Sequence, residues 1–164
     1  MNEDPNAECM VCRKHRGEES VPGGPIYQDA LIFSSHAGLF GGETTHYLGH
    51  LFIEPKRHAP GLADLTIEEA EAIAVHATRL ARALMETLGQ VHIYSFILGD
   101  HVPHLHVHVI GRYPEAPREF WGPRVDEWPG APKGTQAEIA QVTSRIREFY
   151  ASRYRRHDPP GTPG

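Results

Sequence analysis

Three histidines alternate with apolar residues in one segment of the chain, which reads His104, Leu105, His106, Val107, His108, Val109 and Ile110. Alternation with a period of two is typical of a half-buried β-strand, because successive side chains point to opposite faces. The pattern predicts a strand over residues 104–110 with all three imidazoles on one face. Valine or threonine would make a better strand, and histidine is the side chain that changes charge near neutral pH. We therefore expect the chemistry of the protein here.

The spacing of these histidines limits what they can do together. Alternate side chains of a regular strand lie about 6.8 Å apart, and those four residues apart lie about 13 Å apart. Ligands stand about 2.1 Å from a zinc ion, so two neighbouring histidines could share a metal but three could not. The three must therefore have different roles, such as metal binding, nucleophilic attack and contact with substrate charge. A metal hydrolase with His104 and His106 on one ion stays open as an alternative.

Length and composition fit a single globular domain. The chain has 164 residues, of which 40% are hydrophobic and 23% charged, and its formal net charge is −5. Acidic and basic residues are mixed along the chain, which argues against a nucleic-acid partner. The apolar runs are too short to span a bilayer, and the first residues do not resemble a signal peptide. We expect a cytoplasmic protein with no membrane partner.

Local patterns predict an α+β protein in which mostly antiparallel strands pack against two helices. Capping boxes begin the helices, one at Thr66 with Glu69 and one at Thr135 with Glu138. These helices are expected to end at Gly89 and near Tyr150. Strands are expected over residues 26–35, 46–53, 91–98 and 104–110, and the short turn between the last two makes them antiparallel neighbours.

We expect one domain over residues 1–150. It includes an irregular segment over 1–24, which carries both cysteines, and a C-terminal loop and helix over 111–150. Residues 151–164 are expected to be disordered. The Pro- and Gly-rich stretch 111–134 contains Trp121 and Trp128, and we expect Trp121 to be a buried structural aromatic residue. The remaining isolated histidines, His76 and His157, are expected at the surface.

The chain has two cysteines, Cys9 and Cys12, which form a C-x-x-C pair. A reducing cytoplasm disfavours a disulfide, and the absence of an expected strand and helix start here disfavours a redox dithiol. A tetrahedral zinc site needs two more nitrogen or sulfur ligands, and the chain has twelve histidines to supply them. His15 is a local candidate for a third ligand, or a surface residue.

Two further histidines stay open between a functional and a structural role. His50 follows Gly49 in an expected strand and lies either near the other histidines or simply at a strand edge. His58 lies in an expected loop, which suits a surface residue or a ligand that bends toward a metal. The chain has neither a Walker-type phosphate loop nor a Gly-x-Ser-x-Gly motif. Any phosphate would therefore be held by histidines and backbone amides.

These segments resemble the motifs of the histidine triad (HIT) superfamily of nucleotide hydrolases and transferases. Residues 104–110 match its His-φ-His-φ-His-φ-φ motif, where φ is apolar, and residues 49–58 match its upstream Gly-His, apolar strand and Pro-Lys-x-His segment. The resemblance covers roughly residues 9–112. It implies a five-stranded antiparallel sheet with two helices, in a homodimer that binds nucleotides at the histidine strand.

The resemblance also implies a role for each motif residue. His106 looks like the nucleophile that attacks the α-phosphate of a nucleotide and forms a nucleotidyl-histidine intermediate. His50 and His108 look like the residues that contact phosphate oxygens. In the branch related to galactose-1-phosphate uridylyltransferase a structural zinc ion has four ligands, and the matching residues here are Cys9, Cys12, His58 and His104.

The chain departs from the family pattern just before the first triad histidine. Most relatives carry a Gln and a small hydroxyl residue there, where this chain has Asp100 and His101. His101 could replace the hydroxyl as a phosphate donor or leaving-group acid, whereas an ionised Asp100 would repel phosphate. The expected function is hydrolysis of a nucleoside polyphosphate, dinucleoside polyphosphate or nucleoside phosphoramidate. The alternatives are a nucleotidyltransferase or phosphorylase, and a non-catalytic zinc-stabilised nucleotide-binding adaptor.

Overall fold

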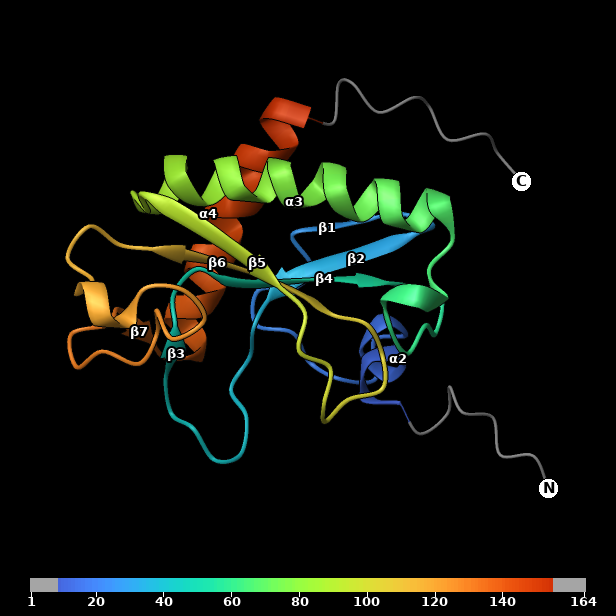
Figure 1. Ribbon diagram of the computed structural model, residues 1–164, viewed down its shortest axis with the longest axis horizontal. Helices are drawn as coiled ribbons and strands as arrows, with labels where there is room; N and C mark the ends of the chain where they lie inside the picture. The colour runs from blue at the N-terminus through green and yellow to red at the C-terminus, as the bar shows by residue number, and fades with distance from the viewer. Residues whose placement is uncertain (1–8, 155–164) are drawn as a thin grey trace.

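An antiparallel sheet of five strands, in the order β1-β2-β4-β6-β5, organises the molecule (Figure 1). The computed structural model describes residues 9–154. Two long helices, α3 (Ile67–Leu88) and α4 (Gln136–Tyr154), pack on one face of the sheet. The strands are β1 (Tyr27–Gln28), β2 (Ile32–His36), β4 (His50–Pro55), β5 (His92–Phe96) and β6 (Val107–Arg112). This is the α+β architecture that the sequence predicts.

The main core lies between the sheet and the two helices. Leu51 and Ile53 of β4 pack there together with Val107 and Val109 of β6. Because side chains alternate along a strand, the residues between them project from the opposite face of the sheet. These residues include the functional candidates, so the helices cover one face and the site occupies the other.

Both predicted helix starts are confirmed. The Thr66 hydroxyl accepts a hydrogen bond from the Glu69 N–H at 3.2 Å, and the Glu69 carboxylate accepts one from the Thr66 N–H at 2.9 Å. The Thr135 and Glu138 pair forms the same reciprocal arrangement. Gly89, in the left-handed conformation, ends α3 as predicted, whereas α4 continues to Tyr154, beyond its expected end near Tyr150.

The N-terminal segment 1–24, which was expected to be irregular, contains helical structure. A short helix, α2 (Met10–His15), follows directly after Cys9. Six residues are too few to show helical periodicity in a sequence. The helix is held by its contacts with the rest of the molecule, since Val11 and Cys12 are buried.

The strand expected over residues 46–53 is divided in two. Gly49 has a φ of 92°, a conformation that interrupts an extended strand and that L side chains rarely adopt. The segment before it, β3 (His46–Tyr47), pairs with β7 (Lys133–Gly134) in a separate two-stranded sheet. The segment after it enters the main sheet as β4. The bend therefore brings His46 back toward His50.

The histidine strand is shorter than predicted. Regular pairing begins at Val107, so His104 and His106 precede β6. The Leu105 N–H donates to the carbonyl oxygen of Ala59, at 2.7 Å, in the loop after β4 rather than to a neighbouring strand. Only His108 is therefore a regular strand residue, and the uniform spacing assumed for the three histidines does not apply to the first two.

Two expectations about single residues are wrong. Trp121 is 45% exposed: the guanidinium group of Arg112 lies over its ring, and the ring packs into neither hydrophobic core cluster. His76 is buried at 5% exposure, because α4 covers it and the Tyr150 hydroxyl forms a hydrogen bond with its ring.

Two short 3-10 helices, Leu62–Asp64 and Arg118–Phe120, interrupt the loops. No helix within residues 9–154 is both long and apolar enough to cross a membrane. His157 and most of the expected tail lie outside the described residues.

Candidate functional site

Two cysteines and two histidines from three parts of the chain come together beside α2. Their potential ligand atoms all lie within 4.8 Å of one another, and the four residues are Cys9, Cys12, His58 and His104. The Cys12 sulfur lies 3.5 Å from Nδ1 of His58 and 3.4 Å from Nδ1 of His104. The Cys9 sulfur lies 3.5 Å from the same nitrogen of His104. Ligands about 2.0 to 2.3 Å from a tetrahedral ion are separated by about this much.

The surroundings of this cluster suit a metal. Nε2 of His104 donates to the carbonyl oxygen of Pro55 at 2.8 Å, which leaves the Nδ1 lone pair directed at the cysteines. Burial lowers the pKa of His104 to about 4, so the ring is neutral near pH 7, the form that binds metal. Arg57 pairs with Glu69 at 2.7 Å and so fastens the loop that carries His58 to α3. Two cysteines with two histidines are a donor set of structural zinc sites.

His15 lies next to this cluster but is outside it. Its Nε2 is 2.9 Å from the buried carboxylate of Glu54, and Lys14 pairs with the other carboxylate oxygen. Burial alone would raise the pKa of Glu54, but the charge and hydrogen bonds of Lys14 and His15 outweigh burial and lower it. The carboxylate is therefore ionised, and His15 hydrogen-bonds to it rather than joining the two cysteines.

The middle histidine of the triad is held by the backbone of the first. Nδ1 of His106 lies 2.8 Å from the carbonyl oxygen of His104. A carbonyl oxygen only accepts hydrogen bonds, so Nδ1 carries the proton and Nε2 of a neutral His106 carries the lone pair. The ring is partly buried and tilted against His108, with the ring centroids 5.3 Å apart. The arrangement presents an unprotonated ring nitrogen.

The third histidine pairs with His50 across neighbouring strands. Nδ1 of His108 lies 2.9 Å from Nε2 of His50. Burial lowers the pKa of His108 to about 4, helped by the charge of His106. Burial and the neighbouring imidazoles also lower the pKa of His50 well below its ordinary value. Both rings are therefore neutral at pH 7, and His50 belongs to the triad site rather than to a plain strand edge.

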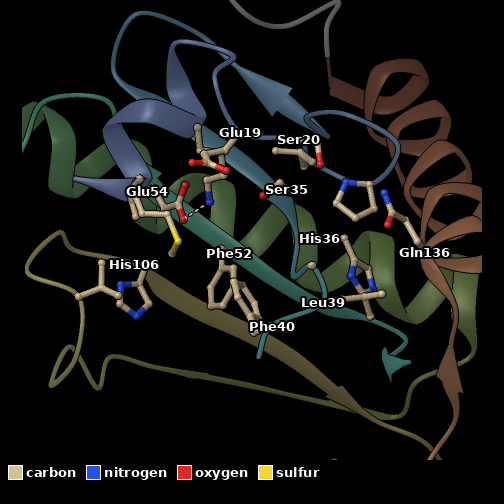
Figure 2. A pocket seen from close by; sticks show the side chains of 17 residues that line it. Glu19, Ser20, Ser35, His36, Leu39, Phe40, Phe52, Glu54, His106 and Gln136 are labelled. Atoms are coloured by element: carbon tan, nitrogen blue, oxygen red, sulfur yellow. Dashed lines mark hydrogen bonds and ion pairs between the residues drawn. The ribbon is translucent and has the colours of Figure 1, made fainter. Parts of the chain in front are cut away.

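A cavity of about 400 Å³ extends from His106 along the site face (Figure 2). Figure 2 shows His106 at one end, His36 and Gln136 at the other, and Phe40 and Phe52 between them. The wall is completed by α2, through Met10, Val11 and Lys14, and by the loop that contains Glu19 and Ser20. The cavity therefore has aromatic rings in its middle, and charged or polar side chains both along the wall with Lys14 and Glu54 and at its far end.

The two residues that depart from the family pattern do not line this cavity. Asp100 and His101 are both exposed, and the following Val102 lines the cavity instead. Within residues 9–154, no hydrogen bond joins His101 to the other candidate site residues. The structure therefore brings His106, His108 and His50 together and leaves His101 apart.

Several site residues were missed by sequence reasoning. Lys14, Glu54 and Gln136 are ordinary charged or polar residues in the sequence, and no spacing rule separates them from surface residues. His46 could have been suspected, because it lies four residues before His50 in a chain rich in histidine. Its Nε2 lies 3.0 Å from Nδ1 of His50, a contact that depends on the bend at Gly49.

Comparisons with solved structures agree with this geometry at the level of the fold. A HIT-like protein involved in cell-cycle regulation from Bartonella henselae superposes with a TM-score of 0.67 at 17% identity, covering 91% of this chain and 99% of that one. A zinc-bound histidine triad family protein from Mycobacterium smegmatis gives 0.65 at 21% identity, covering 90% and 96%. A hypothetical histidine triad nucleotide-binding protein from Sulfolobus tokodaii gives 0.67 at 16% identity, covering 91% and 96%.

Comparison at the sequence level points to the same family. Among curated protein sequences, none matches the chain. The profile of the HIT domain family matches residues 25–115, more than half of the chain, and this span contains His50, His58 and all three triad histidines. This protein therefore belongs to the HIT domain family.

Proposed function

We propose that this protein is a nucleotide hydrolase that acts on the α-phosphate of a nucleoside polyphosphate, dinucleoside polyphosphate or nucleoside phosphoramidate. The observation that carries the proposal is the 2.8 Å hydrogen bond from Nδ1 of His106 to the His104 carbonyl oxygen. It leaves a lone pair on Nε2, at the end of a cavity of about 400 Å³. A neutral imidazole in that state is a competent nucleophile.

The proposed reaction has two steps. Nε2 of His106 attacks the α-phosphorus, and the bond from phosphorus to the leaving atom breaks as a nucleotidyl-histidine forms. Water then attacks the same phosphorus, the phosphorus–nitrogen bond breaks, and the nucleoside monophosphate leaves. His108 lies beside His106 and would donate a hydrogen bond to a phosphate oxygen when its Nε2 is protonated, while His50 holds the His108 ring through its Nδ1. The cavity beyond Phe52 would receive the nucleoside.

We further propose that Cys9, Cys12, His58 and His104 hold one zinc ion with a structural role. All four positions of a tetrahedral site are then taken by protein atoms, which leaves none for substrate. The ion would fasten α2, and with it one wall of the cavity, to the sheet. The proposed reaction would then depend on the histidines outside the zinc site, which are His106, His108 and His50.

A homodimer in the cytoplasm is part of the same proposal. β5 is an edge strand of the sheet, and apolar side chains near it are exposed, among them Val91, Ile97 and Leu98. An exposed apolar edge is a common site of pairing with a second chain. Sedimentation of the purified protein tests this part, and a monomer at micromolar concentration would contradict it.

The central test looks for the covalent intermediate. The zinc-loaded protein is incubated separately with diadenosine polyphosphates and adenosine phosphoramidate, and its intact mass and the released AMP are measured. We expect a nucleotidyl adduct and turnover in the wild type, and neither in His106→Ala. His92→Ala, on the exposed side of β5, is the matched control and should behave as wild type. An adduct released only by a second acceptor indicates a transferase, and binding with neither adduct nor turnover indicates the adaptor.

The zinc assignment has its own test. Metal analysis of the purified protein should give one zinc per chain. His58→Ala should lose it and His106→Ala should keep it. The opposite result would favour the metal hydrolase with His104 and His106 on one ion.

A further inference from the structure

Three imidazoles and a carboxylate form a continuous hydrogen-bonded chain from the triad to the surface. Nδ1 of His108 lies 2.9 Å from Nε2 of His50. Nδ1 of His50 lies 3.0 Å from Nε2 of His46. Nδ1 of His46 lies 3.3 Å from the carboxylate of Glu43, whose side chain is 47% exposed. Neither Glu43 nor His46 belongs to the motif segments 49–58 and 104–110.

The geometry of the rings suits hydrogen bonds along this chain. Neighbouring rings are inclined by only 23° for His46 with His50 and 27° for His50 with His108. Nitrogen lone pairs of imidazole lie in the ring plane, so nearly coplanar rings align donor and acceptor. Phe96 stacks on His108, and Phe52 packs against both His50 and His108, which fixes the rings in place.

One carboxylate is enough to set the proton positions of all three rings. Ionised Glu43 only accepts hydrogen bonds, so Nδ1 of His46 must carry a proton. A neutral His46 then accepts at Nε2 from Nδ1 of His50, and His50 in turn accepts at Nε2 from Nδ1 of His108. This order leaves Nε2 of His108 without a proton. That nitrogen is buried and has no hydrogen-bond partner within the described residues, which is costly unless it is used.

We propose that Glu43 and His46 are positioning residues of the active site, which set the tautomers of His50 and His108 and relay a proton between His108 and the surface. This inference rests on the proposed function. With one extra proton, the positive charge is placed on His46 beside Glu43, and both inner rings stay neutral. The two hydrogen bonds between the rings are then reversed, Nδ1 of His46 still donates to Glu43, and His108 carries its proton on Nε2.

The relay balances the protons of the two proposed steps. When the leaving group departs, it takes the Nε2 proton of His108. His108 takes a proton from His50, and His50 takes one from His46, which returns the chain to its neutral order. When water attacks the phosphorus on His106, the proton of the water returns to Nε2 of His108 and the chain reverses. His106 regains its lone pair on Nε2 as the phosphorus–nitrogen bond breaks.

Other titratable groups near the chain are few and do not replace Glu43. His36 on β2 and His106, just before β6, act on His50 through their charge and, together with burial, favour its neutral form. The aromatic rings of Phe52 and Phe96 that cover the inner rings carry no charge. Among the carboxylates of residues 9–154, Glu43 is the one that hydrogen-bonds to this row of imidazoles.

The test reads the tautomers directly and needs no turnover. Nitrogen-15 spectra of the histidine rings are recorded on the full-length, zinc-loaded protein, on His46→Phe and on Glu43→Gln. We expect protons on Nδ1 of His46, His50 and His108 in the wild type. His46→Phe should leave His50 and His108 in mixed tautomers, and Glu43→Gln should do so for His46. Glu86→Gln, on the exposed face of α3, is the matched control.

A second arm measures the relay. Binding of AMP should take up a proton, seen as a dependence of the binding enthalpy on the ionisation enthalpy of the buffer. Glu43→Gln should abolish the uptake at pH 7 and move the alkaline limb of adduct formation down by about half a pH unit. A proton on Nε2 of His46 in the wild type, or unchanged spectra in both variants, would overturn the inference. Failure of AMP to bind would instead count against the proposed function, because the tautomers are read without it.

Discussion

At the scale of single residues, the buried carboxylate of Glu54 is the clearest case outside the triad of a charged group that depends on specific partners. It lies on the site face of β4 at 2% exposure, with Lys14 on one oxygen and His15 on the other. A buried charge without a partner is costly, whereas removal of both partners is often nearly neutral. The ion pair of Lys14 with Glu54 therefore links α2 to the sheet. It contributes to stability mainly because neither charge is left buried without a partner.

Replacing Lys14 tests this pair. We expect Lys14→Met to lower the free energy of unfolding by about 3 kcal/mol, because the carboxylate of Glu54 loses its cation. The double variant Lys14→Met with Glu54→Gln should recover part of the loss. Urea unfolding measures both, and Lys133→Met, which changes an exposed lysine, is the control. Equal midpoints for Lys14→Met and the control would contradict the expectation.

At the scale of elements, the bend between β3 and β4 positions His46 against His50. Gly49 has a φ of 92°, and a Cβ there would lie 2.4 Å from the side-chain nitrogen of Gln90. We expect Gly49→Ala to cost about 1 to 3 kcal/mol for the backbone conformation, with a further loss from crowding. Gly42→Ala is the matched control, because its φ is 85° and no atom lies within 4 Å of its added Cβ. Thermal unfolding compares the two, and an equal loss would show that crowding contributes nothing.

The proposed zinc site would hold the short helix α2 against the rest of the molecule. Two of the proposed ligands, Cys9 and Cys12, flank or belong to it, while Met10 and Lys14 line the cavity. Removal of zinc with a chelator should speed amide hydrogen exchange over residues 9–19 and weaken the binding of AMP, because α2 loses one of its attachments to the rest of the molecule. Exchange over α4 serves as the internal reference. Unchanged hydrogen exchange over residues 9–19 would show that the metal does not stabilise this wall of the cavity.

At the scale of the whole molecule, buried histidines make stability depend on pH. His36 is 1% exposed; its Nδ1 donates to the Ala37 carbonyl oxygen and its Nε2 accepts from the Gly49 N–H at 2.9 Å. Burial lowers its pKa from 6.5 to about 4. The unfolded chain then binds the extra proton first, so stability is fully present above pH 6.5 and falls as the pH drops toward 4.

The corresponding measurement is chemical unfolding between pH 4 and 7.5. The lowered pKa of His36 corresponds to a loss of at most about 3 kcal/mol over this range. His36→Gln should be less stable than wild type at pH 7.5 but should lose less stability on acidification. Parallel curves for the two proteins would contradict the assignment. Because zinc release also contributes in acid, the difference between the curves is compared rather than either curve alone.

The sequence by itself predicted the class of fold and the family. Alternating apolar residues, two capping boxes and a left-handed glycine are local signals, and they placed the main strands and α3 with few errors. The motif around His104, His106 and His108 identified the HIT family, and the profile over residues 25–115 confirms it. The resemblance to the family also named the two cysteines and two histidines of the candidate metal cluster, and the structure brings them together.

Contacts between distant segments were decided only by the tertiary structure. The bend at Gly49, the start of β6 at Val107 and the seating of α2 depend on partners far away in the chain, which no local pattern records. The chain from Glu43 to His108 and the buried pair of Lys14 with Glu54 arise in the same way. Polar side chains acquire a specific role only when folding removes water from around them and supplies one particular partner. Helices, strands and turns can therefore be predicted from the sequence, whereas the pairing of buried polar groups depends on the tertiary fold.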